Sequence, residues 1–129
     1  YDYENGRRIP SSLVEAIINH ASQEIGIARR DFSSAEISER LALAMIAEGF
    51  DILQEKIAQR PADIDLVEIH GYGFPRWLGG PMQLAEEWGL DNVRHRIANL
   101  ASYDPLSWWS SPFLDELSSR KVKLSSLNS

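Results

Sequence analysis

The chain has 129 residues, of which 43% are hydrophobic and 25% charged, and its net charge is −6. This is the composition of an ordinary globular domain, and the acidic balance disfavours binding to nucleic acid or to an anionic membrane surface, because both need a basic surface. There is no cysteine, which excludes disulfides and thiolate metal sites, and no apolar run is long enough to span a bilayer.

The first ten residues show no helical period and contain the turn dipeptide Asn5-Gly6. We expect residues 1–10 to form an extended arm or linker and residues 11–129 to form a single helical domain. The chain starts at Tyr1 without a methionine or a signal-peptide pattern, which suggests a piece of a longer protein.

A first helix is predicted to begin near Ser12 and to end near Gly26. Ser12 and Glu15 have the spacing of a capping box, in which the hydroxyl accepts from first-turn amides and the carboxylate reaches back to the amide of the capping residue. The apolar residues that follow have helical spacing: Leu13, Val14, Ile17, Ile18, Ala21 and Ile25.

The longest predicted helix starts with a second capping box, Ser33 to Glu36, and runs to about Gln59, a length of about 40 Å. Its apolar residues cover more than one stripe, which predicts burial on two sides. Gly49 costs this helix about 1 kcal/mol relative to alanine, unless a neighbouring helix packs closely there. Glu48 lies among these apolar residues, as either a buried, paired carboxylate or a residue of a solvated strip.

Pro61 is expected at the first position of a third, short helix. Asp63 and Asp65 then lie near its N-terminus, where carboxylates complement the helix dipole. The two aspartates also resemble part of a calcium loop, but the other oxygen ligands of that pattern are missing. The sequence predicts no metal site.

A glycine-rich loop follows, and a fourth helix is expected from Gly80-Pro81 to Trp88, ended by Gly89. We interpret the loop as a rigid corner with Tyr72, Phe74, Pro75 and Trp77 as packing anchors. Arg76 is expected to make an interdomain ion pair or, less favoured, to contact a coenzyme A phosphate. The residues of this predicted interdomain packing motif are Gly71, Tyr72, Gly73, Phe74, Pro75, Arg76, Trp77, Gly79, Gly80 and Pro81.

A fifth helix is predicted after a cap at Asp91, Asp104-Pro105 breaks it, and a last short helix starts at Pro112. We find no convincing strand and no repeat. The predicted fold is therefore all-α, a compact bundle of about five to six helices with one long central helix.

No known catalytic pattern is present. The three histidines, His20, His70 and His95, are far apart in sequence and none forms a recognised metal motif with a carboxylate. The glycines match neither a P-loop nor a dinucleotide fingerprint. These residues alone therefore predict no catalytic site and no bound cofactor in this chain.

Two segments carry a resemblance to a known family. They are E-R-L-A-L-A-M-I-A-E-G-F-D-I-L-Q-E-K-I-A, from Glu39, and D-I-D-L-V-E-I-H-G-Y-G-F-P-R-W-L-G-G-P-M, from Asp63. Together they resemble the C-terminal helical domain of 3-hydroxyacyl-CoA dehydrogenases, and most closely its second, final copy in multifunctional fatty-acid β-oxidation enzymes. The resemblance covers nearly the whole chain: residues 1–10 are similar to the linker from the preceding copy, and residues 120–128 to the usual end of those enzymes.

The resemblance implies a parent oxidoreductase of lipid metabolism that oxidises 3-hydroxyacyl-CoA to 3-ketoacyl-CoA with NAD, usually with enoyl-CoA hydratase activity. It places the catalytic residues and the NAD fingerprint in a Rossmann domain outside this chain. The family's helical domain contributes one asparagine in an N-R-L context, where this chain has Glu39 in E-R-L. A carboxylate cannot donate the hydrogen bonds of an amide and repels an anionic coenzyme A thioester, so this copy is expected to be non-catalytic.

Two functions are compatible with this sequence. In the first, the domain supports packing against the preceding helical copy and the Rossmann domain, for an enzyme that takes acyl-CoA substrates. In the second, it is a free-standing module whose glycine-rich loop binds a coenzyme A-type ligand or partner through backbone amides. We also expect the isolated chain to associate, as a homodimer through the long helix or, alternatively, to remain a monomer covered by its N-terminal arm. The missing S-K-L ending favours a cytoplasmic protein.

Overall fold

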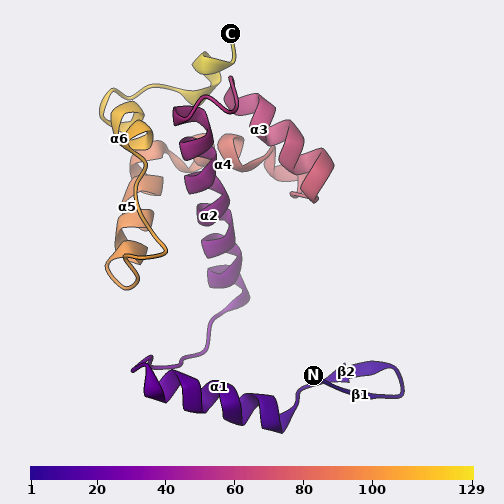
Figure 1. The fold of residues 1–129 in the computed structure, drawn as a ribbon. Helices are drawn as coiled ribbons and strands as arrows, with labels where there is room; N and C mark the ends of the chain where they lie inside the picture. Colours follow the sequence, from indigo (N-terminus) through magenta and orange to yellow (C-terminus); the bar gives the residue numbers. More distant parts are fainter. The chain divides into compact units, whose positions relative to one another are not determined.

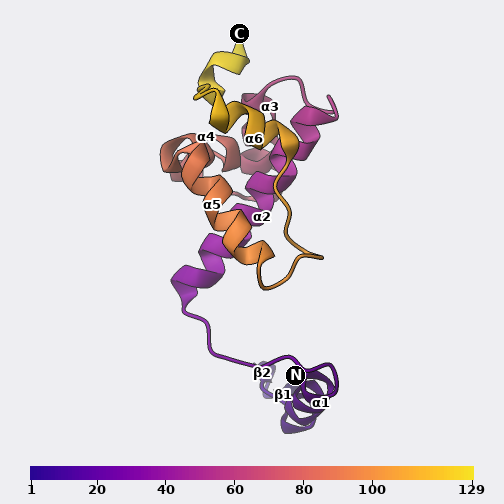
Figure 2. The same ribbon diagram turned by 90° about the vertical axis from the view of Figure 1, so that its left-hand side faces the viewer.

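The computed structural model describes all residues, 1–129, and their contacts form two compact units, Tyr1–Ser33 and Ser34–Ser129. Figures 1 and 2 show the elements of both units. The second unit contains five of the six α-helices. The division falls after residue 33, whereas the sequence suggested a boundary after residue 10.

The first unit begins with a β-hairpin. Strands β1 (Asp2–Glu4) and β2 (Arg7–Ile9) pair antiparallel, with Tyr3 opposite Arg8. The expectation that the chain has no strand was wrong, because Asn5-Gly6 closes a two-residue turn with positive φ at both residues, 50° and 76°. This dipeptide favours hairpins for that reason.

Helix α1 (Ser12–Glu24) completes the first unit. The predicted capping box does not form: Ser11 is the N-cap, it makes no side-chain cap bond, and its carbonyl accepts from the Glu15 amide at 3.0 Å. None of the residues of α1 is buried, so its apolar face is open to solvent.

Helix α2 (Ser34–Gln54) opens the second unit and is shorter than expected. Lys56 adopts a left-handed conformation with φ 60°, and the Ile57 amide donates back to the Ile52 carbonyl at 3.0 Å. This is a Schellman ending on a non-glycine residue, so the sequence showed no stop signal here.

The other elements of the second unit are short. They are α3 (Pro61–Val67), the π-helix η1 (Glu68–Tyr72), the 3₁₀-helix η2 (Arg76–Leu78), α4 (Pro81–Trp88), α5 (Leu90–Ala101), α6 (Pro112–Ser119) and the 3₁₀-helix η3 (Leu124–Asn128). In Figure 1, α2 runs through the middle of this unit, with α5 and α6 on one side and α3 on the other. The all-α fold with one long central helix is confirmed.

The inner face of α2 forms the centre of the core. Its buried residues pack with residues of α3 to α6 and η3: Leu43, Ile46, Phe50, Ile64, Met82, Ala85, Leu90, Val93, Ile97, Leu114, Leu117 and Leu124. Gly49 lies directly against the Met82 sulfur, and a Cβ there would collide with it. The close helix approach that we considered for Gly49 is thus present.

The outer face of α2 remains exposed. Leu41 is 63% exposed and Ile37 47%, so the second apolar stripe exists but has no cover within this unit. Glu48 is also exposed, which decides in favour of the solvated strip and against a buried, paired carboxylate.

The N-termini of α5 and α6 differ in how they are capped. Gly89, not Asp91, is the N-cap of α5, and Asp91 lies in its first turn, so that prediction was wrong. At the start of α6, the Gln54 side chain accepts from the Ser111 hydroxyl at 3.0 Å and from the Phe113 amide at 3.1 Å. The end of α2 therefore fixes the beginning of α6.

Candidate functional site

The corner between α3 and α4 is held by the side chain of Asp65. Its carboxylate accepts from the backbone amides of Met82 at 2.7 Å and Gln83 at 3.1 Å, which satisfies two free donors in the first turn of α4. Asp65 therefore caps the next helix, α4. We had expected it to complement the dipole of its own helix, α3. Asp63 does act at the start of α3, because it accepts from the Arg60 amide at 3.2 Å and pairs with the Arg60 guanidinium at 2.6 Å.

Gly80 makes this contact possible. Its φ is 105°, and a Cβ on it would overlap the Asp65 carboxylate. The position therefore requires glycine for two reasons, a backbone angle that side chains disfavour and the close approach of the cap. Burial raises the pKa of Asp65, and the hydrogen bonds from the Met82 and Gln83 amides oppose this.

The same contact bears on anion binding by the loop. A free helix N-terminus attracts phosphate through its amides, but the α4 amides of Met82 and Gln83 already donate to a carboxylate. The negative charge of Asp65 also repels an anion from this place. The loop therefore offers no phosphate cradle at the start of α4.

The predicted packing anchors of the loop differ in exposure. Phe74 is buried at 8% exposure and Pro75 is half-buried, but Tyr72 is 78% exposed and Trp77 84%. Within this chain only the first two anchor the loop. Arg76 is exposed and has no side-chain partner in the chain.

The glycines of the loop also differ in their roles. Gly73 and Gly79 adopt the left-handed conformation with φ 78° and 74° and end the π-helix and the 3₁₀-helix, respectively. Gly71 has an ordinary φ, and a Cβ there would meet nothing within 4 Å. The corner is thus shaped by three glycines with positive φ, Gly73, Gly79 and Gly80, whereas nothing in the structure requires a glycine at position 71.

Glu39 forms a tertiary ion pair. Its carboxylate accepts from the Arg96 guanidinium at 3.0 Å, and this pair joins α2 to α5. Arg96 also donates to the Asn92 side chain at 3.2 Å and lies over the ring of Trp88, 4.8 Å from its centre. The carboxylate is therefore already engaged by a fixed cation, and a cavity of about 190 Å³ adjoins the pair.

Sequence reasoning missed the role of Arg96. The neighbouring cations Arg94 and His95 both pair with Asp91 of the same helix, at 3.0 Å and 3.6 Å. Arg96 instead faces α2. The partner Glu39 is 57 residues away, so no local spacing could have indicated it.

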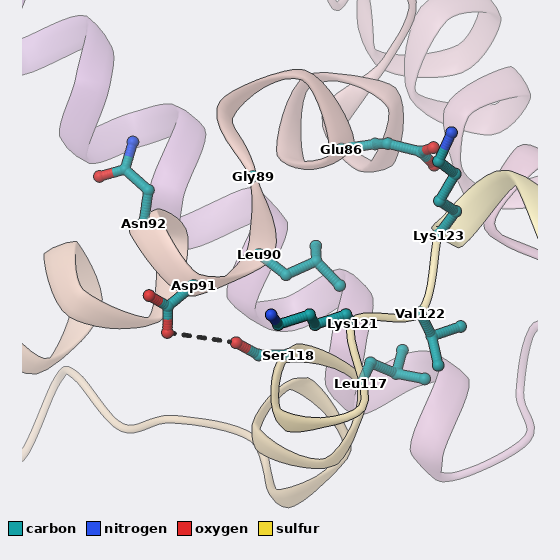
Figure 3. A pocket seen from close by; sticks show the side chains of 10 residues that line it. All are labelled: Glu86, Gly89, Leu90, Asp91, Asn92, Leu117, Ser118, Lys121, Val122 and Lys123. Carbon is teal, nitrogen blue, oxygen red and sulfur yellow. Dashed lines mark hydrogen bonds between the residues drawn. The ribbon is translucent and has the colours of Figure 1, made fainter.

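A second feature that sequence reasoning missed is an open pocket of about 640 Å³ between the α4–α5 corner, α6 and the turn after it. Figure 3 shows Lys123 beside Glu86, and Lys121 nearer to Leu90 and Ser118. The Ser118 hydroxyl donates to the Asp91 carboxylate at 3.4 Å. Glu86 is held by the Ser125 amide at 2.6 Å. The acids of this pocket are thus committed to internal partners.

The acid Asp91 of this pocket provides a test of pH dependence. The hydrogen bond from Arg94 first, and then the charge of His95, hold the pKa of Asp91 below its ordinary value of 3.8. The stabilisation is present above that value and is lost as the pH falls through the lowered pKa. In an NMR titration, we expect Arg94→Gln to raise the Asp91 pKa, while Arg120→Gln, which breaks the separate pair with Glu116, leaves it unchanged. An Asp91 pKa that is equal in all three proteins would contradict this account.

No group of three or more histidine, aspartate or glutamate side chains is placed to hold a metal ion. None of the helices has both the length and the apolar character that crossing a bilayer requires.

Most of the chain matches a known protein family. Residues 37–123, which contain all but the first turn of α2, then α3, the glycine-rich corner and α4 to α6, match the model of the 3-hydroxyacyl-CoA dehydrogenase C-terminal domain. The chain belongs to this family. The predicted family is thereby confirmed.

Relatives of this 3-hydroxyacyl-CoA dehydrogenase C-terminal domain include large enzymes. The peroxisomal bifunctional enzyme of Danio rerio is 42% identical over 88 residues, which is 68% of this chain and 12% of that protein. The peroxisomal bifunctional enzyme of Homo sapiens is 37% identical over 106 residues, 81% of this chain and 15% of that protein. The fatty acid oxidation complex subunit alpha of Idiomarina loihiensis is 33% identical over 85 residues, 66% of this chain and 12% of that protein. The chain thus spans less than a sixth of the length of these relatives.

Proposed function

We propose that this domain is the second, final helical copy of a multifunctional fatty-acid β-oxidation enzyme, and that it supports packing between domains without taking part in catalysis. The parent would oxidise 3-hydroxyacyl-CoA to 3-ketoacyl-CoA with NAD. The family match over residues 37–123 supports this, as do relatives named as a bifunctional enzyme and as a fatty acid oxidation subunit.

The observation that carries the non-catalytic role is the ion pair between Glu39 and Arg96. Glu39 stands where the resemblance places the family's asparagine. Its carboxylate is bound to Arg96 at 3.0 Å, and it cannot donate a hydrogen bond to a substrate carbonyl. The position therefore serves to join α2 and α5.

Two exposed surfaces support the packing role. The outer face of α2 exposes Ile37 and Leu41, and the rigid corner exposes Tyr72 and Trp77. Large aromatic side chains are the residues that most often dominate protein interfaces. The preceding helical copy and the Rossmann domain are the proposed partners, and a homodimer through α2 is the proposed state of the isolated chain.

The catalytic part of the proposal is tested by hydride transfer. With NADH and acetoacetyl-CoA, this domain alone should show no oxidation of NADH above background, measured at 340 nm, whereas the parent should turn over. Robust turnover by the domain alone would overturn the non-catalytic role.

The packing part is tested in the parent with two matched variants. Trp77→Ala should lower the parent's thermal stability, because it removes an interface anchor, while Tyr103→Ala, at 86% exposure outside the motif, should leave it unchanged. Equal effects of the two variants in calorimetry would contradict an interdomain role of Trp77.

The alternative, a free-standing module that binds a coenzyme A-type ligand, depends on free amides in the loop. Those at the start of α4 are occupied by Asp65, which disfavours it; micromolar binding of coenzyme A to this chain in calorimetry would revive it. The cytoplasmic location stays a prediction, since two relatives are named as peroxisomal.

A further inference from the structure

An apolar groove lies between the end of α2 and α3, on the second unit. Its cavity is about 490 Å³, and its apolar lining consists of Ile52, Ile57, Ala58, Ile64 and Val67. Ile57 is 72% exposed and Val67 57%. The groove belongs neither to the Glu39–Arg96 contact nor to the glycine-rich corner.

The rim of the groove is acidic. Asp63 and Glu68 line it, and Asp63 is neutralised by Arg60 at 2.6 Å. The Glu68 side chain makes no hydrogen bond or ion pair within the chain. The groove thus combines an apolar floor with one uncommitted negative charge.

These properties favour a protein segment, and not a small anionic ligand, as the occupant of the groove. Small-molecule sites bury most of their ligand, whereas Ile57 and Val67 on this rim are open to solvent. The phosphates of an acyl-coenzyme A, or the carboxylate of a fatty acid, would also bring negative charge to Glu68. A segment with an aliphatic side chain and a nearby cation has the matching chemistry.

We propose that the groove binds residues Ile27–Arg29 of a second copy of this chain, with Ile27 in the groove and Arg29 paired with Glu68. This segment lies between α1 and α2 outside any helix or strand, Ile27 is 58% exposed, and Arg29 is exposed and without a partner. The segment therefore has both an uncovered aliphatic side chain and an uncommitted positive charge.

The spacing of the two segments also matches. In an extended chain, residues i and i+2 point the same way and stand about 6.6 Å apart. On the groove wall, Ile64 and Glu68 are four residues apart along one helical segment, a rise of about 6 Å. An extended Ile27–Arg29 pair can therefore place its side chains over the groove floor and over Glu68 together.

The segment of the same copy is too short for this role. Ile27, the residue proposed for the groove, precedes Ser34 by seven residues, which span at most about 25 Å at full extension. Ile52 on the groove wall lies 18 residues along α2 from Ser34, about 27 Å. A second copy is therefore the source of the segment, and two copies can exchange their segments reciprocally around a two-fold axis.

The absence of cysteine in the chain makes a disulfide test direct. Chains carrying Ile27→Cys are mixed with chains carrying Ile57→Cys under mild oxidation, and the heterodimer is quantified by non-reducing mass spectrometry. We expect its yield to be at least about fivefold above that of the matched pair Ile27→Cys with Leu106→Cys, since Leu106 is 91% exposed and away from the groove. All three positions are exposed, and circular dichroism verifies that the variants fold.

Charge exchange then tests the ion pair. Adding Glu68→Arg to the Ile57→Cys chain should reduce the yield to that of the control, and adding Arg29→Glu to the Ile27→Cys chain should restore it. A yield equal to the control from the start, or no restoration by the exchange, would overturn the proposal. So would a double variant, Ile27→Cys with Ile57→Cys, that closes within one chain, because the segment of the same copy would then occupy the groove.

Discussion

Replacing Gly80 with alanine should lower the free energy of unfolding by about 3 kcal/mol. Holding a non-glycine residue in a disfavoured backbone region costs about 1–3 kcal/mol, and Gly80 has φ 105°. The new Cβ would also displace the Asp65 carboxylate, and the loss of a helix cap costs about 1 kcal/mol more. Urea unfolding followed by circular dichroism measures the change.

Gly71→Ala is the matched control for this prediction. It adds the same methyl group to the same loop, but φ at Gly71 is not positive and nothing lies within 4 Å of the new Cβ. We expect a change within about 1 kcal/mol, in the stabilising direction, because alanine restricts the unfolded chain. Equal losses in the two variants would show that the Asp65–Gly80 contact does not hold the corner.

Phe50→Ala should cost about 3–5 kcal/mol, the usual range for a large core side chain replaced by alanine. Phe50 is fully buried at 0% exposure, in the cluster that joins α2 to α3, α4, α5 and α6. A loss of this size is a large part of the stability of a small domain. Thermal and urea unfolding should both show it.

Leu41→Ala on the same helix is the control, because Leu41 is 63% exposed. A substitution at such a position changes stability by about 0.5 kcal/mol or less. If Leu41→Ala destabilised the chain as strongly as Phe50→Ala at a dilution at which sedimentation shows a monomer, the outer face of α2 would already be covered within the chain, and its proposed role as an interface would be excluded.

Elements with strong local signals were predicted well. Pro61, Pro81 and Pro112 mark the starts of α3, α4 and α6, and Gly89 marks the end of α4. Proline suits a first helical turn and glycine a left-handed end whatever the neighbours are. The end of α2 was misplaced because Lys56 takes a conformation that glycine usually fills.

The candidate site was less predictable, because its contacts join distant parts of the chain. The Asp65 cap on α4 spans 17 residues and the Glu39–Arg96 pair spans 57. Neither separation leaves a periodic or short motif. From local sequence alone, Asp65 was therefore expected to complement the dipole of its own helix, and no partner was predicted for Glu39.

By itself, the sequence determined the helical class, most helix starts and the family, since these depend on local propensity and on a long motif around the glycine-rich corner. Only the tertiary structure decided which residues that motif exposes. Phe74 enters the core, whereas Trp77 remains 84% exposed, although both are aromatic and only three residues apart. Burial depends on which residues pack against a side chain. Those neighbours lie on helices that are distant in the sequence.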